Sequence, residues 1–155
     1  MARSALPAVV LGGLVAGTLD ILYAFVFWHF RDVAPGAILR SVASGVLGEA
    51  AYEGGAPAAA LGLGLHFVIA LGWAALFYVA ARRFSALVQH AAVAGMLYGL
   101  VVYVLMNYVV VPLSASPLTP SHDGVVIVGG VLAHVFLIGL PIALIARRTL
   151  APKAA

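Results

Sequence analysis

Two histidines, His66 and His134, stand inside long apolar runs, where a side chain that can ionise needs an explanation. Each run is rich in glycine, and a glycine lies four residues before each histidine (Gly62 and Gly130). Residues four apart lie on the same face of a helix, so each histidine would have an uncovered patch of backbone beside it. Ionisable side chains are expensive within a bilayer, and their presence points to a function or to a buried polar contact.

The composition of the chain predicts an integral membrane protein. Of its 155 residues, 65% are hydrophobic and only 8% are charged, and the mean hydropathy is +1.15. Soluble domains are roughly half apolar and about one quarter charged. The net charge of +3 comes from basic residues grouped beside apolar runs, which is typical of membrane topology signals and not of a nucleic-acid-binding surface. The absence of cysteine excludes disulfides, thiolate metal sites and a cysteine nucleophile.

Four apolar segments are each close to the roughly 20 residues that a helix needs to cross a bilayer. They lie at about residues 8–30, 57–81, 91–111 and 125–146. The first segment is longer than a signal-peptide core and contains Asp20, so we expect it to be retained as a transmembrane helix. The sequence therefore predicts an all-α, polytopic membrane protein, a four-transmembrane-helix bundle that forms a single membrane domain over residues 1–155.

The charged residues divide between the two ends of the predicted bundle. One end carries most of the basic residues: Arg3, Arg82, Arg83, Arg147, Arg148 and Lys153. The other end carries Arg31 and Arg40 together with Asp32, Glu49, Glu53 and Asp123. Since cytoplasmic loops are enriched in Lys and Arg, this distribution predicts that both termini lie in the cytoplasm. We expect the aromatic residues near the predicted helix ends to lie at the membrane interfaces: Trp28, Phe30, Tyr52, Tyr78 and Tyr108.

The loop between the first two segments contains a further helical pattern. Pro35 suits the first turn of a helix, and apolar residues then recur at helical spacing through Leu47. We expect a short amphipathic helix over about residues 36–52 on the outer membrane surface, ended by Gly54 and Gly55. Later in the chain, Asn107, Pro112 and Pro141 are typical of bent transmembrane helices with freed carbonyl groups.

Each predicted transmembrane helix carries one polar side chain at a similar depth. These residues are Asp20, His66, Tyr103 and His134. At 1.5 Å per residue, each histidine lies about 13 Å from the outer end of its helix. Facing positions of a four-helix bundle meet in its core, so the sequence predicts an intramembrane polar layer.

Three interpretations of this layer compete. The layer can be structural, with interhelical hydrogen bonds and with close helix packing at glycines such as Gly17, Gly62, Gly95 and Gly130. It can handle protons or ions, since an intramembrane aspartate with histidines nearby can relay protons. It can also hold haem b between His66 and His134, with Gly62 and Gly130 leaving room for the macrocycle. Haem b is the one cofactor that the residues suggest.

Several short stretches resemble a group of bacterial inner-membrane proteins that are loosely YagU-like. They are residues 15–23, 40–48, 64–67 and 111–114, and residues 133–136 through Arg147 and Arg148. The resemblance implies a multi-pass, four-helix protein of the bacterial inner (cytoplasmic) membrane. It implies no reaction and assigns no functional residue.

We expect a non-catalytic accessory or interaction subunit of a membrane complex. Its partners would be the lipid bilayer and either further copies of itself, as a homo-oligomer, or a larger membrane complex. The first alternative is a small proton- or ion-coupled permease that uses Asp20, His66 and His134. The second alternative is a bis-histidine haem b electron carrier.

Overall fold

The protein is all-α over the residues that the computed structural model describes, 5–150. In order, the elements are α1 (Ala5–His29), α2 (Pro35–Leu47), α3 (Ala50–Glu53), α4 (Gly55–Arg83), α5 (Ser85–Gln89), α6 (Ala91–Leu105), the π-helix η1 (Met106–Val110), α7 (Val111–Leu113), α8 (Gly124–Ala133), the π-helix η2 (His134–Gly139) and α9 (Leu140–Leu150). The predicted all-α fold class is confirmed.

Four continuous helical stretches are long and apolar enough to cross a membrane. They are Leu6–His29, Gly55–Arg83, Ala91–Leu113 and Gly124–Leu150. They correspond to the four predicted segments, and the second and fourth extend beyond their predicted limits at both ends. Their outer surfaces expose many large apolar side chains, among them Leu22, Val68 and Leu97. Such surfaces suit lipid, which confirms the expected membrane character of the bundle.

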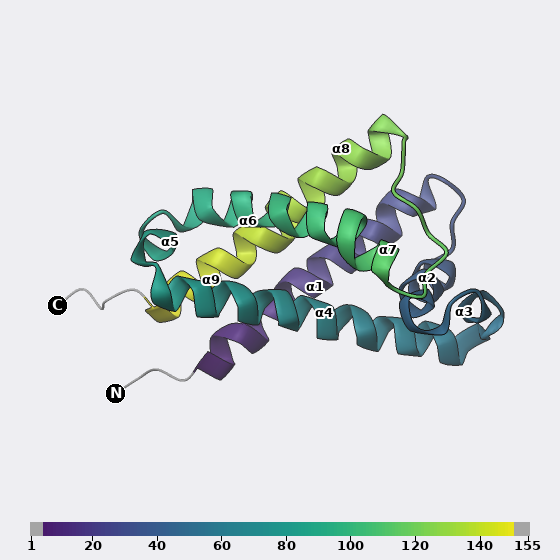
Figure 1. Ribbon diagram of the computed structural model, residues 1–155, viewed down its shortest axis with the longest axis horizontal. Helices are drawn as coiled ribbons and strands as arrows, with labels where there is room; N and C mark the ends of the chain where they lie inside the picture. Colours follow the sequence, from purple (N-terminus) through teal and green to yellow (C-terminus); the bar gives the residue numbers. More distant parts are fainter. Residues whose placement is uncertain (1–4, 151–155) are drawn as a thin grey trace.

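The chain runs along the bundle four times, each time in the direction opposite to the last, so the four long helices form an antiparallel bundle (Figure 1). We call one end the arginine end, because it carries Arg82, Arg83, Arg147 and Arg148 and the first and last described residues. The opposite end carries Asp32, Glu49, Glu53 and Asp123, and we call it the acidic end. Arg3 and Lys153, which were assigned to the arginine end from sequence, lie outside the described residues.

At the arginine end the helices pack closely. Small residues such as Ala74, Ala81 and Ala143 are buried there around Phe77 and Ile142. Tyr78 belongs to this core with 3% of its surface exposed, so the expectation that it lies at an interface is wrong. Tyr78 is buried because it lies on the face of α4 that meets the other helices. Its distance from the end of the helix does not decide its burial.

Glycines bring helix backbones into direct contact near the middle of the bundle. A side chain at Gly95 would lie 2.7 Å from the Gly139 carbonyl oxygen, and one at Gly99 would overlap the backbone at His134. The α6 and η2 backbones therefore touch, as in other membrane-type helix pairs with small residues at the crossing. Gly17 of α1 instead makes room for two side chains of α4, the ring of Phe67 and the methyl group of Ala70.

The two π-helices occur where the chain approaches a proline. Proline has no N–H group, and its ring clashes with the carbonyl of residue i−4, so the preceding turn must widen. Pro112 follows η1, and the Val111 N–H bonds to the Met106 carbonyl five residues back. Pro141 follows η2, and the Leu140 N–H bonds to the Val135 carbonyl. The wide turns lie where the sequence predicts bends.

The helix predicted over residues 36–52 is divided in two. Pro35 begins α2 as expected, but α2 ends at Leu47 because Gly48 takes a left-handed conformation with φ of 61°. The short helix α3 follows. The N-terminal half of α2 packs against α4, with the Leu39 carbonyl resting on Gly62.

The far side of α2 is fixed to the loop that joins α7 to α8. The hydroxyl groups of Ser44 and Ser116 lie 2.8 Å apart, and the Ala115 N–H donates to the Gly45 carbonyl. Ser44 is fully buried by these contacts. The helix α2 is thereby held across the acidic end of the bundle, between α4 and the loop.

We predict that Gly62→Ala separates α2 from α4. A Cβ atom at Gly62 would overlap the Leu39 carbonyl and lie 3.2 Å from the Ala43 nitrogen, both of them backbone groups that cannot rotate away. The expected loss in the free energy of unfolding is about 1–3 kcal/mol, measured by thermal or denaturant unfolding in detergent.

Gly64→Ala is the matched control, because a Cβ at Gly64 meets nothing within 4 Å. This variant should be neutral or more stable by up to about 1 kcal/mol, since alanine favours helix. Equal stabilities of the two variants would contradict the contact between α2 and α4.

Candidate functional site

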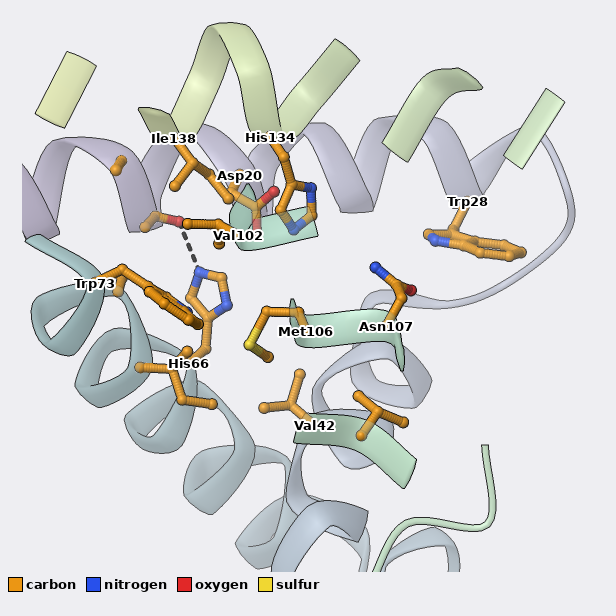
Figure 2. A pocket seen from close by; sticks show the side chains of 15 residues that line it. Asp20, Trp28, Val42, His66, Trp73, Val102, Met106, Asn107, His134 and Ile138 are labelled. Atoms are coloured by element: carbon orange, nitrogen blue, oxygen red, sulfur yellow. Dashed lines mark hydrogen bonds between the residues drawn. The ribbon is translucent and has the colours of Figure 1, made fainter. Parts of the chain in front are cut away.

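A cavity of about 330 Å³ lies between the helices and is bordered by three of the four predicted polar residues (Figure 2). Its lining comes from α1, α2, α4, α6 and the fourth span: Ala16, Gly17, Asp20, Trp28, Val42, His66, Ile69, Ala70, Trp73, Val102, Met106, Asn107, Val111, His134 and Ile138. Asp20, His66 and His134 border one end of the cavity, whereas Trp28 and Asn107 border the other.

The carboxylate of Asp20 faces this cavity without a hydrogen-bond donor. It lies near both imidazoles, close enough for an electrostatic interaction with each. Over residues 5–150, however, no protein group donates a hydrogen bond to it. Buried polar groups in folded proteins nearly always have a partner. An intramembrane carboxylate that faces open space instead is therefore a candidate functional group.

His66 is held in one tautomer by a contact between helices. Its Nε2 lies 2.8 Å from the Gly17 carbonyl oxygen of α1, and since a carbonyl accepts, Nε2–H donates. The ring can reach this carbonyl because Gly17 has no side chain and packs directly against α4. In the neutral imidazole the other nitrogen, Nδ1, then carries a free lone pair on the cavity side of the ring.

His134 is held in the opposite tautomer by its own helix. Its Nδ1 lies 2.9 Å from the Gly130 carbonyl one turn earlier, so Nδ1–H donates and Nε2 keeps its lone pair. The ring of Tyr103 meets the imidazole edge to face, with the two centroids 5.4 Å apart. Tyr103 fits here because Gly130 has no side chain: a Cβ at Gly130 would lie 2.9 Å from the tyrosine ring.

A second cavity, of about 220 Å³, continues from the first towards the acidic end. The two cavities share Asp20, Trp28, Asn107 and His134. The second is further lined by aromatic rings and by residues next to the α8 N-terminus: Tyr23, Phe27, Tyr103, Ser121 and Val126. Together the cavities extend from the loop at the acidic end to Asp20 in the middle of α1.

In the other direction the passage is closed. Val102 and Ile138 border the first cavity and belong to the closely packed core that fills the arginine end. Tyr98 reinforces the closure, because its hydroxyl donates to the Trp73 carbonyl at 2.6 Å and so joins α6 to α4. The cavities that Asp20 borders therefore extend towards the acidic end, and the described residues on their arginine-end side belong to the packed core.

The structure places all four predicted polar residues around these two cavities. Tyr103 borders only the second, and within the described residues its hydroxyl bonds to neither Asp20 nor His134. Of these four residues, only His66 makes an interhelical hydrogen bond within the described part of the chain. The structural interpretation therefore accounts for His66 and leaves Asp20 unexplained.

Sequence reasoning missed the walls of the site. The sequence predicts Trp28 at a membrane interface and indicates no role for Trp73, yet both border the first cavity. The sequence predicts a helix bend at Asn107, and the Asn107 side-chain amide donates to the Tyr103 carbonyl. It also borders both cavities. One signal in the sequence could have indicated these lining residues. Trp28 and Asn107 interrupt apolar runs, on the side of their helices that carries the polar layer.

An ion pair lies at the acidic end, next to the lining residues Phe27 and Trp28 of the second cavity. Arg31, which follows α1, donates to Asp123 at 2.8 Å, and the Asp123 carboxylate also caps α8 by accepting from the Val125 N–H. The Arg31 guanidinium lies over the rings of Phe27 and Trp28, 5.4 and 5.9 Å from their centroids. The hydrogen bond from Arg31 is the main reason that the pKa of Asp123 lies below its usual value.

The geometry does not fit haem b. Gly62 and Gly130, expected to leave room for the macrocycle, are covered by the α2 backbone and by the Tyr103 ring. The His66 Nε2 is already bonded to Gly17, and the two histidines present different nitrogens to the cavity. Within residues 5–150 no three His, Cys, Asp or Glu side chains gather as a metal site would require.

Comparison with known proteins adds no relative: no family model, no curated protein and no solved structure matches this chain. The YagU-like resemblance stays a prediction.

We predict that the Arg31–Asp123 pair contributes to stability at neutral pH and ceases to do so in acid. Because the folded-state pKa of Asp123 is lowered, the contribution is present above the ordinary value of 3.8 and is lost as the pH falls through the folded-state pKa. Asp123→Asn keeps the helix cap and removes the charge. It should lower the melting temperature at pH 7 and have little effect below about pH 3.

The control is Arg31→Gln, alone and combined with Asp123→Asn. If the two residues act as a pair, the loss of stability in the double variant should be smaller than the sum of the losses in the two single variants. An effect of Asp123→Asn that is the same at pH 3 and pH 7 would contradict this account.

Proposed function

We propose that the protein is a small proton- or ion-coupled permease in which Asp20 exchanges protons or cations with the acidic-end side of the membrane. The observation that supports it best is the Asp20 carboxylate, which has no donor from the described residues and borders cavities that continue to the acidic end. A residue that served only to hold helices together would be bonded to another helix, as His66 is.

The side chains that border the first cavity around Asp20 favour the binding of a positive charge. The carboxylate of Asp20 and the free nitrogens of neutral His66 and His134 are all acceptors. A protonated imidazole gains a second N–H and could then donate to Asp20, so the three groups can hold protons in turn. The other titratable groups that border the cavities are the hydroxyls of Tyr23 and Tyr103.

The direction of access follows from the charges of the loops. By the positive-inside rule, the arginine end and both termini lie in the cytoplasm and the acidic end faces outward. The resemblance to bacterial inner-membrane proteins implies that this membrane is the bacterial inner (cytoplasmic) membrane. In this arrangement Asp20 is reached from outside the cytoplasmic membrane, and transport requires the closed arginine end to open.

An interaction subunit is the second candidate, and one observation favours it. A Cβ atom at Gly64 or Gly72 of α4 would meet nothing within 4 Å, although most glycines of the spans contact another helix. Another helix, from a second copy or from a larger complex, could pack there. This function requires neither cavity and predicts no transport.

The test is proton flux in proteoliposomes, followed with an internal pH-sensitive dye after a pH jump and with valinomycin present to balance charge. The intact chain should speed the collapse of the pH gradient. Asp20→Asn keeps the size of the side chain but cannot ionise, so the protein-dependent rate should fall at least about tenfold. Asp32→Asn is the matched control, because Asp32 lies at the acidic end and borders neither cavity.

Flux through Asp20→Asn at the rate of the intact chain would contradict the proposal. Absence of flux from the intact chain under every gradient would also contradict it and would leave the interaction subunit as the function. In that case single cysteines at Gly64 or Gly72 should form disulfides between copies.

A further inference from the structure

Three acceptors border the first cavity, and their types indicate which cation suits it. They are the Asp20 carboxylate, the His66 Nδ1 and the His134 Nε2. Calcium and magnesium require several oxygen ligands, and among the described residues the lining holds a single carboxylate. A primary ammonium group carries one positive charge and three N–H donors. It can neutralise Asp20 through a charge-assisted hydrogen bond without a ring of ligands around it.

The walls of the cavities suit an organic cation. Trp28 and Trp73 border the first cavity, and Tyr23, Phe27 and Tyr103 border the second. The faces of aromatic rings attract cations, tryptophan most strongly. Trp28 already lies beside one cation, the Arg31 guanidinium, whose charge is balanced by Asp123. An anion would meet the Asp20 carboxylate and gain nothing from these rings.

The size of the cavity limits the molecule. At about 330 Å³ the first cavity is at the lower end of the range for small-molecule sites. Val42, Ile69 and Met106 give it an apolar surface that a short alkyl group can cover. A bulky or multiply charged amine would not fit.

We infer that this cavity binds a small organic amine in its primary ammonium form, with the ammonium group at Asp20 and the alkyl part along the apolar lining of Val42, Ile69 and Met106. The inference rests on the proposed function and adds the substrate class. It also supplies the coupling: a proton on Asp20 removes the charge that holds the ammonium group, so proton and amine occupy the site in turn.

The two tryptophans of the chain, Trp28 and Trp73, both border this cavity, so intrinsic fluorescence reports on it without a label. The full chain in non-ionic detergent at pH 7.5 is titrated with n-butylammonium chloride. We expect a saturable change in tryptophan emission that weakens as the pH is lowered. Asp20→Asn should weaken binding roughly tenfold to a hundredfold, since a charge-assisted hydrogen bond is lost.

Controls on the ligand and on the protein make the result specific. Butyltrimethylammonium has the same charge but no N–H donor, and butyrate has the opposite charge. Both should bind at least about tenfold more weakly than butylammonium. Asp32→Asn should bind as the intact chain does, because Asp32 borders neither cavity. Asparagine also tolerates the positive φ of 57° found at this position.

Two results would overturn the inference. One is no saturable response to butylammonium, or an equal response in Asp20→Asn. The other is equal binding of butyltrimethylammonium, which would exclude hydrogen-bond donation from the ammonium group. This second result does not depend on how well the Asp20 variant folds. Proton flux that depends on Asp20 without any amine response would reject the amine and retain the proposed function.

Discussion

Close packing of small residues at the arginine end is the constraint on which the rest of the structure depends. Helices in lipid gain little from burying apolar surface against one another, so they associate where backbones can approach. Gly95, Gly99 and Gly139 continue this close approach, between α6 and the fourth span, to the middle of the bundle. From this packed region the helices diverge towards the acidic end, and α4 and α8 lie far apart there (Figure 1).

The divergence creates the space that the polar residues face. A four-helix bundle packed equally along its length would have no room beside Asp20. Here α2 and the loop after α7 partly cover the open end, held together by the contact between Ser44 and Ser116. The result is a bundle with one closed end and one hollow end, and the ionisable side chains lie where the two meet.

The backbone also sets the chemistry of the two histidines. Each imidazole donates to a carbonyl of a glycine, and each therefore presents a lone pair to the cavity. The wide turns that begin at His134 and Met106 flank the same cavity. π-Helical turns of this kind frequently occur at functional sites. Two prolines thus shape the site from a distance, without contributing a side chain to it.

The fold could be predicted well from the sequence, because four runs of apolar residues admit few arrangements in a membrane. The depth of Asp20, His66 and His134 could be predicted too, since helical rise is constant. The division of the loop helix at Gly48 could not, because glycine is compatible with both a continued and a broken helix until the tertiary contacts decide. The roles of Trp28 and Trp73 were missed for a similar reason. Which face of an apolar helix meets its neighbours is invisible when all faces are apolar, and the burial of Tyr78 shows the same limit.

If Asp20 lies in a space that opens only at the acidic end, the accessibility of introduced cysteines should depend on the side of the membrane. The chain contains no cysteine, so single cysteines can be introduced without altering the background. A membrane-impermeant, positively charged thiosulfonate reagent would be added to either side of oriented vesicles. We expect Asn107→Cys to be modified from the acidic-end side only and Ala74→Cys, in the packed core, to be modified from neither. Modification of Asn107→Cys from the arginine-end side would show that the space is open at that end.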